Sequence, residues 1–160
     1  MEDWLQDFKE TVENTSSRLL AISESESEQP RAEDHWSAKQ ILGHLIDSAA
    51  NNHARFVVGQ LKDDLVFPGY DQDGWVRTNH YQEAAWPRLV ELWRSYNLHL
   101  HHLMTHADKE KMRTPCTLHT LEEIAFNTVP RAEPVTLEYL MQDYVVHLKH
   151  HLAQILSATA

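Results

Sequence analysis

The segment EYLMQDYVVHLKHHLAQIL, residues 138–156, has the spacing of a buried helix but carries three histidines in five positions. His147 and His151 are four residues apart, so on a helix they lie on one face, about 6 Å apart along the axis. Two imidazoles in that arrangement can bind one divalent ion. Asp143 is one turn back on the same stripe, where a carboxylate can accept the ring N–H of a ligand histidine. His150 then points elsewhere.

An earlier segment offers a third ligand. Four polar residues in HLIDSAANNHARF recur at intervals of three and four: His44, Asp47, Asn51 and Arg55. They run beside an apolar stripe, so we expect them to face the interior of a helical bundle or its mouth. If His44 meets His147 and His151 there, three neutral imidazoles bind the ion and leave a coordination position open, as in catalytic zinc or nickel sites.

The residues around these histidines suggest further roles. Asp47 and Asp143 are candidate general bases. Arg55 either orients an anionic or electrophilic substrate or forms a surface ion pair, and the ion pair is the favoured interpretation. In the long segment after the second helix, Tyr70 and Trp75 are candidate walls of a substrate or cofactor pocket.

The same residues also fit structures without a metal. The chain has 12 histidines, and a pair with one-turn spacing is by itself weak evidence for a ligand site. A lone His44 on an interior face is typical of a hydrogen-bonded core residue. NLHLHHLMTH contains a second pair, His102 and His106, and His102 is a candidate fourth ligand that would close the site. A catalytic site, a closed structural site and a polar core network all remain open.

Composition narrows the classes of partner. The chain of 160 residues has 14 basic and 24 acidic residues, a formal net charge of −10, which opposes binding to nucleic acid. The single cysteine, Cys116, leaves no thiolate cluster, so a metal must be held by nitrogen and oxygen. The first residues lack the basic start and apolar run of a signal peptide, and no segment approaches the roughly 18 apolar residues of a membrane span. We expect a soluble, cytoplasmic protein without a membrane partner.

Helical spacing dominates the chain and predicts an all-α fold. The pattern predicts one domain over residues 1–160, a four-helix bundle with long crossover loops. The acidic stretch after the first helix, SESESEQPRAEDHW, is predicted to be a loop, and Thr120 with Glu123 is predicted to cap a short helical turn. The long helices are predicted from Trp4 to Ile22, from Ser37 to about Gln60, from Pro87 to near Ala107, and from Thr136 to about Leu156.

Three segments together resemble the DinB/YfiT-like superfamily of candidate metalloenzymes: HWSAKQILGHLIDSAANNHARF, GYDQDGWV and VTLEYLMQDYVVHLKHHLAQIL. The most specific element is one histidine early in the second helix followed by H-x-x-x-H in the last. The resemblance implies a bundle in up-down-down-up order and homodimers. It also implies a divalent ion, usually zinc or nickel, bound by His44, His147 and His151.

The resemblance implies chemistry on a small molecule. Some members of the superfamily transfer groups to low-molecular-weight thiols, so thiol-dependent S-transfer is the first expectation. Hydrolysis by a metal-activated water is the second. The third is a metal-binding stress or interaction protein without turnover.

Overall fold

The computed structural model describes residues 3–157, and in that range the chain is helical with no strand. The long helices are α1 (Asp3–Leu20), α3 (Ala38–Leu61), α5 (Trp86–His106) and α8 (Leu137–Ser157). Short helices occupy the connections: α2 (Glu24–Glu28), α4 (Gln72–Thr78), η1 (Tyr81–Glu83), α6 (Lys109–Arg113) and α7 (Leu121–Ile124). Residues 1–2 and 158–160 of the predicted domain lie outside the described residues.

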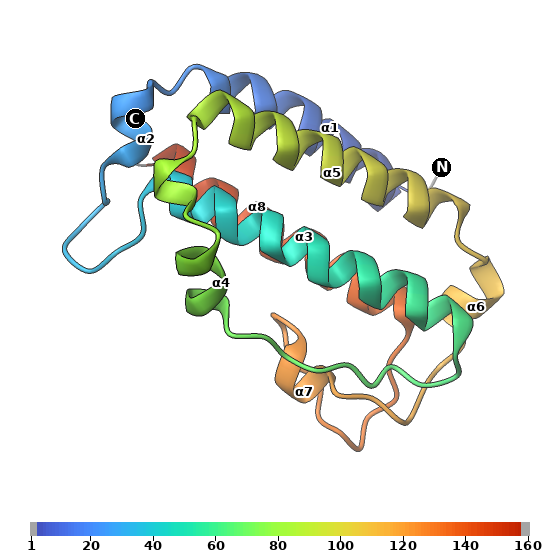
Figure 1. Ribbon diagram of the computed structural model, residues 1–160. Coiled ribbons are helices and arrows are strands. Elements are labelled where there is room, and N and C mark those ends of the chain that lie inside the picture. Colours follow the sequence, from blue (N-terminus) through green and yellow to red (C-terminus); the bar gives the residue numbers. More distant parts are fainter. Residues whose placement is uncertain (1–2, 158–160) are drawn as a thin grey trace.

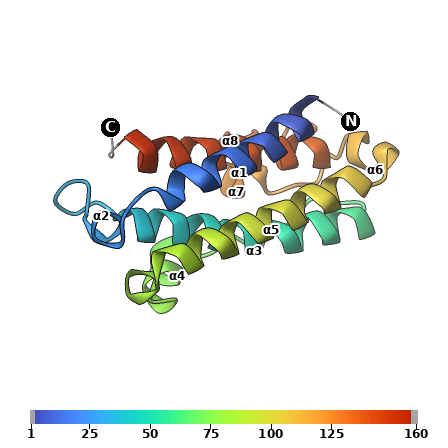
Figure 2. The same ribbon diagram turned by 90° about the horizontal axis from the view of Figure 1, so that it is seen from above.

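The long helices form the predicted four-helix bundle. α1 and α8 run in one direction, and α3 and α5 run in the other (Figures 1 and 2). α1 contacts α5 and α8, and α3 also contacts α5 and α8, so the helices close around one core. The up-down-down-up order is therefore confirmed, and it sets α3 and α8 antiparallel as neighbours.

The core comes from the apolar stripes that the sequence predicts. Phe8, Val12 and Leu19 of α1 are fully buried. Trp86 is buried at the start of α5, and its indole Nε1 donates a 2.7 Å hydrogen bond to the carbonyl of Leu19. Burying a side chain of the size of Leu or Phe stabilises the fold by about 1.5–3 kcal/mol, so these contacts fix α1 against α5.

The start of α3 is fixed by a capping box, as predicted. The Ser37 hydroxyl accepts from the backbone N–H of Gln40 at 3.3 Å, and the Gln40 side chain accepts from the backbone N–H of Ser37 at 2.9 Å. Because this box satisfies two otherwise unpaired N–H groups, it sets the register of the helix. His44 follows two turns later.

Gly43 lets another segment approach α3 closely beside His44. A Cβ at Gly43 would lie 2.1 Å from Cδ2 of Tyr81, which no real contact allows. The glycine therefore admits the Tyr81 ring, whose hydroxyl donates a 2.6 Å hydrogen bond to Asp47.

The acidic linker is exposed over most of its length, as predicted, but it is not a loop throughout. It contains α2, whose N-cap Ser23 forms a capping box with Glu26. Glu24 and Glu28 of α2 form ion pairs with Lys39, which is only 1% exposed. Burial lowers the pKa of Lys39, but hydrogen bonds to these two carboxylates outweigh it and raise the pKa overall. The prediction of a loop was wrong for residues 24–28, because a buried cation in the next helix needs these carboxylates.

The predicted turn near residue 120 exists as α7, but Thr120 does not cap it with its side chain. The Thr120 hydroxyl instead accepts from the backbone N–H of Phe67 and donates to the carbonyl of Phe67, both at 2.9 Å. Leu65 pairs with His119 in an isolated parallel bridge. These bonds tie the two crossover connections together.

Candidate metal centre

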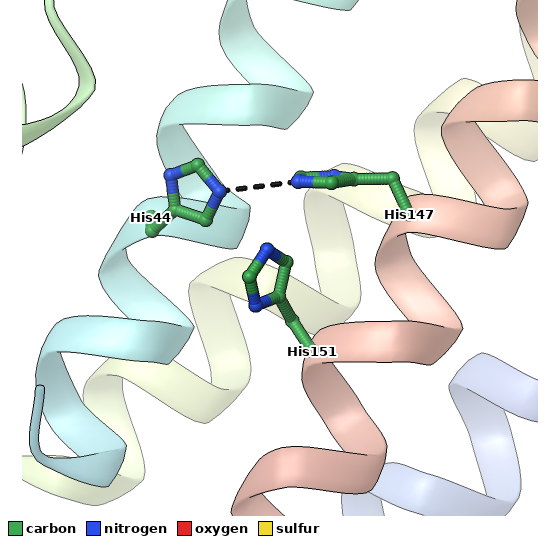
Figure 3. A group of neighbouring side chains, drawn as sticks. All are labelled: His44, His147 and His151. Atoms are coloured by element: carbon green, nitrogen blue, oxygen red, sulfur yellow. Dashed lines mark hydrogen bonds between the residues drawn. The ribbon is translucent and has the colours of Figure 1, made fainter. Parts of the chain in front are cut away.

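His44 of α3 and His147 and His151 of α8 converge between the two neighbouring helices (Figure 3). Nε2 of His44 lies 3.2 Å from Nε2 of His147. One ring nitrogen from each residue lies within 4.8 Å of the other two. Nitrogens bound to one tetrahedral zinc at 2.0–2.1 Å stand roughly 3.3 Å apart, so small side-chain movements would bring all three onto one ion.

These imidazoles are neutral at physiological pH, which is the form that binds a metal. Burial lowers the pKa of His44 to about 4, and the charge of His151 acts in the same direction. Burial also lowers the pKa of His147 to about 3, assisted by the neighbouring histidines. The pKa of His151 is lowered chiefly by burial. The three rings are therefore uncharged, and each has a nitrogen lone pair that can bind a metal.

Gln154 orients one of the three rings. Nδ1 of His151 lies 2.7 Å from the side-chain oxygen of Gln154, which can only accept, so Nδ1 donates and Nε2 keeps its lone pair. The Gln154 amide group in turn donates to Nε2 of His150 at 3.2 Å, which fixes the direction of the amide. Sequence reasoning missed Gln154, although its position three residues after His151 was the available signal.

The donor set fits a divalent ion better than a polar core network. Among residues 3–157, one hydrogen bond joins the three rings, between His44 and His147, and Nε2 of His151 has none. A network without metal would satisfy all three rings. Three neutral nitrogen donors suit zinc or nickel.

Two cavities meet at His151. The Trp36 cavity has a volume of about 1020 Å³, and its walls include Arg31, His35, Trp36, Asp73, His151 and Gln154. The Arg55 cavity has a volume of about 300 Å³, and its walls include Ser48, Asn52, Arg55, Tyr70, His147 and His151. The Trp36 ring packs against His44 with centroids 5.2 Å apart. His151 thus lines both cavities, and His147 lines the Arg55 cavity alone.

Asp47 and Asp143, the candidate bases, are engaged elsewhere. Oδ1 of Asp47 accepts from Tyr81 at 2.6 Å and from Asn79 at 3.1 Å, and burial raises its pKa to about 6. Asp47 lines neither cavity. Among the described residues, Asp143 does not hydrogen-bond to a histidine ring. Its two oxygens accept the backbone N–H groups of Phe126 and Asn127, both at 2.7 Å.

Asp143 nevertheless shapes the site. Phe126, which it anchors through the backbone, packs against His147 with ring centroids 5.3 Å apart. Phe126 also lines the Arg55 cavity. Asp143 therefore positions a wall of the site instead of orienting a ligand ring.

Arg55 does not form the surface ion pair that the sequence favours. It is only 7% exposed, and its guanidinium donates to the carbonyl of Pro68 at 3.0 Å and weakly to Asn52 at 3.4 Å. The prediction was wrong because α3 turns this position toward the cavity rather than toward solvent.

The two aromatic candidates separate into a wall and a support. Tyr70 lines the Arg55 cavity, and burial raises its pKa to about 12. Trp75 packs edge-on against Tyr70 with centroids 5.3 Å apart and lines neither cavity.

His102 is not a fourth ligand, because its ring lies against His106, at 4.2 Å between centroids, outside the three-histidine cluster.

The sequence profile of the DinB superfamily matches residues 7–155. The chain belongs to the DinB superfamily. This DinB protein is 23% identical over 158 residues to YfiT of Bacillus subtilis, named as a candidate metal-dependent hydrolase, with 96% of this chain and 81% of YfiT covered. A Geobacillus thermodenitrificans protein named in the same way is 23% identical over 162 residues, covering 98% of this chain and 83% of its own.

The fold of this DinB protein matches a solved structure. YfiT from Bacillus subtilis, described as having an unusual four-helix bundle topology, superimposes with a TM-score of 0.78 at 21% identity. The match covers 98% of this chain and 83% of the YfiT chain. None of the helices within residues 3–157 is long and apolar enough to cross a membrane.

Proposed function

We propose that this DinB protein is a metal-dependent enzyme in which His44, His147 and His151 bind one zinc or nickel ion and act on a small molecule. The observation that supports it is the convergence of three neutral imidazoles, His44 buried and His147 and His151 partly buried, beside two cavities that His151 lines. An ion held this way would lower the pKa of a bound water or thiol toward neutrality. Separately, burial lowers the pKa of the three histidines and so keeps them unprotonated for binding.

We further propose thiol-dependent group transfer as the reaction. Transfer brings together two reactants, a thiol and an electrophile, and the two cavities at His151 give each its own approach. The Trp36 cavity has room for a low-molecular-weight thiol, and its wall carries both basic and acidic side chains: Arg31, His35, Glu26, Asp34 and Asp73. Asp47 lines neither cavity, and both oxygens of Asp143 accept backbone N–H groups, so neither is placed to act as the base that hydrolysis would use.

Hydrolysis is the second candidate. It is favoured by the names of the relatives from Bacillus subtilis and Geobacillus thermodenitrificans, both of them candidate metal-dependent hydrolases. Both reactions would use the same ion and the same ligands. They differ in the nucleophile that the ion binds, which is a thiol in transfer and water in hydrolysis. The homodimer implied by the superfamily stays a prediction, which light scattering tests.

The experiment compares three zinc-loaded proteins: the wild type, His147→Ala and His102→Ala. Each is incubated with monochlorobimane and one thiol at a time: bacillithiol, mycothiol or glutathione. In transfer, a carbon–sulfur bond forms, the carbon–chlorine bond breaks, chloride leaves and the thiol proton goes to solvent. Each protein is also incubated with p-nitrophenyl acetate without thiol, to detect hydrolysis, and its metal content is measured.

We expect near one equivalent of metal and thiol-dependent turnover in the wild type and in His102→Ala, with both lost in His147→Ala. Ester hydrolysis with that same mutant pattern and no thiol reaction would support hydrolysis over transfer. Bound metal with neither reaction would favour a protein without turnover. Absence of metal from the wild type would overturn the site itself.

A further inference from the structure

Arg55 is a buried cation without an anionic partner in the described part of the chain. Its side chain donates to the backbone carbonyl of Pro68 and to the amide oxygen of Asn52, both uncharged. Among residues 3–157, no carboxylate lies within ion-pair distance of its guanidinium, whereas the buried cation Lys39 pairs with Glu24 and Glu28.

An unpaired guanidinium at this depth is energetically unfavourable. Burial lowers the pKa of Arg55, and since arginine titrates so far above neutrality, the side chain still carries its charge at pH 7. A buried charge is normally paired because its lost hydration otherwise costs several kcal/mol. A charge kept unpaired on the wall of a cavity indicates a partner that comes from outside the protein.

The Arg55 cavity connects this cation to the metal centre. It is bounded by α3, by the segment carrying Tyr70, by the end of α7 and by α8, which contributes His147 and His151. Ser48, Asn52 and Tyr70 add neutral hydrogen-bonding groups beside Arg55. Its volume of about 300 Å³ is at the lower end of the range for small-molecule sites.

The two acidic residues on the cavity wall are already engaged. Asp143 uses both oxygens to accept backbone N–H groups. Glu123 lies 3.4 Å from the guanidinium of Arg131. Their charges are therefore partly compensated, and Arg55 is left as the uncompensated charge of the wall.

We propose that the Arg55 cavity binds an anionic group, a carboxylate or a phosphate, of the small molecule on which the metal centre acts. Arg55 binds the anion, with Asn52 and Tyr70 beside it, while the reacting end of the molecule lies near His147 and His151. The assignment of this molecule as a substrate rests on the proposed function, whereas anion binding by Arg55 does not.

The test measures anion binding directly. Full-length protein, metal-free after chelation, is titrated with succinate and separately with inorganic phosphate, by calorimetry and by amide NMR spectra. We expect saturable binding of at least one probe, with the largest shifts at Ser48, Asn52 and Tyr70. The probe that binds more tightly assigns the anion as carboxylate or phosphate. Because no metal is present, the result is independent of the proposed function.

Three variants make the test specific. Arg55→Met keeps the apolar stem and removes the charge, Arg55→Lys keeps the charge, and Arg94→Met removes an exposed arginine from α5 as the matched control. We expect Arg55→Met to weaken binding at least tenfold, Arg55→Lys to weaken it less, and Arg94→Met to leave it unchanged. Before chelation, all four proteins should have equal zinc content.

Three results would overturn the proposal. The first two are that the wild type binds neither probe, or that it binds one with the largest NMR shifts away from Ser48, Asn52 and Tyr70. The NMR result needs no variant, so it decides even if Arg55→Met does not fold. In zinc-loaded protein, binding that first appears with zinc and is equal in Arg55→Met would assign the anion to the ion and also overturn the role of Arg55.

Discussion

Two histidine pairs of this protein have the same spacing and different surroundings. His147 and His151 on α8 have ring centroids 4.6 Å apart, and His102 and His106 on α5 have centroids 4.2 Å apart. The α5 pair is exposed, and Nδ1 of His106 donates to the carbonyl of His102 on its own helix. The α8 pair faces α3 and meets His44.

The comparison shows that one-turn spacing creates a pair of ligands but does not create a site. Both pairs have rings of similar separation, and each has a ring oriented by a hydrogen bond at Nδ1. The α8 pair differs in burial and in the third nitrogen from a neighbouring helix. We expect the affinity for metal to depend on the presence of that third nitrogen.

The largest effect is expected from removing that nitrogen. His44→Leu leaves the α8 pair with two ligands, like the α5 pair, and the leucine fills a buried apolar site of similar size. We expect zinc affinity, measured by competition with a chromophoric chelator, to fall by more than about 100-fold, because even groups behind the ligands contribute about 10–100-fold. His102→Leu is the matched control, and an equal loss in both variants would contradict the comparison.

A smaller effect is expected from the group that orients His151. Gln154→Leu removes the acceptor for Nδ1, so the ring can rotate or change tautomer, and zinc affinity should fall by about 10–100-fold. Gln154→Glu restores an acceptor and should retain most of the affinity. Gln142→Leu, on the same helix and outside the cluster, controls for loss of a polar side chain. Unchanged affinity in Gln154→Leu would rule out the orienting role.

The buried rings should also make the metal-free protein sensitive to acid. The folded pKa of His44 is about 4, below its ordinary value of 6.5, so between these values the unfolded chain binds a proton that the folded chain does not. The free energy of unfolding should therefore decrease as the pH falls from about 6.5 toward 4, by about 2 kcal/mol at pH 5 for this residue.

The contribution of His44 is separated by comparison with His44→Leu in urea at pH 7 and pH 5. Asp47 acts in the opposite direction, because its pKa is raised to about 6 in the folded protein, but it is present in both proteins and cancels. An equal pH dependence in the wild type and His44→Leu would show that His44 is not buried as a neutral ring.

The smallest effect is expected at the α5 pair. The double substitution His102→Ala and His106→Ala should change the free energy of unfolding by less than about 0.5 kcal/mol, as for other exposed positions, and should leave the metal content unchanged. Chemical denaturation and elemental analysis measure the two quantities. Lost metal would show that the exposed pair also binds ions.

Much of the fold could be predicted because its determinants are local. The capping box at Ser37 and Gln40 and the apolar spacing of α1 act within one or two turns, and both are found as predicted. The acidic linker could not be predicted from composition, because Glu24 and Glu28 are held by Lys39, which lies in a different helix. Arg55 is the opposite case, a charged residue that the sequence places at the surface and the structure buries. An arginine in a polar stripe is expected to be exposed until the burial of that stripe is known.

The sequence by itself determined which residues share a helix face, because 3.6 residues per turn sets His147 above His151 whatever surrounds them. It also determined, through the superfamily resemblance, the order of the bundle. The resemblance also named His44 with this pair, but only the tertiary structure shows the His44 ring beside them, and only it decided that Asp143 binds backbone instead of a ring. These depend on contacts between residues as far as 103 positions apart, which the packing of the whole core selects and no local pattern encodes.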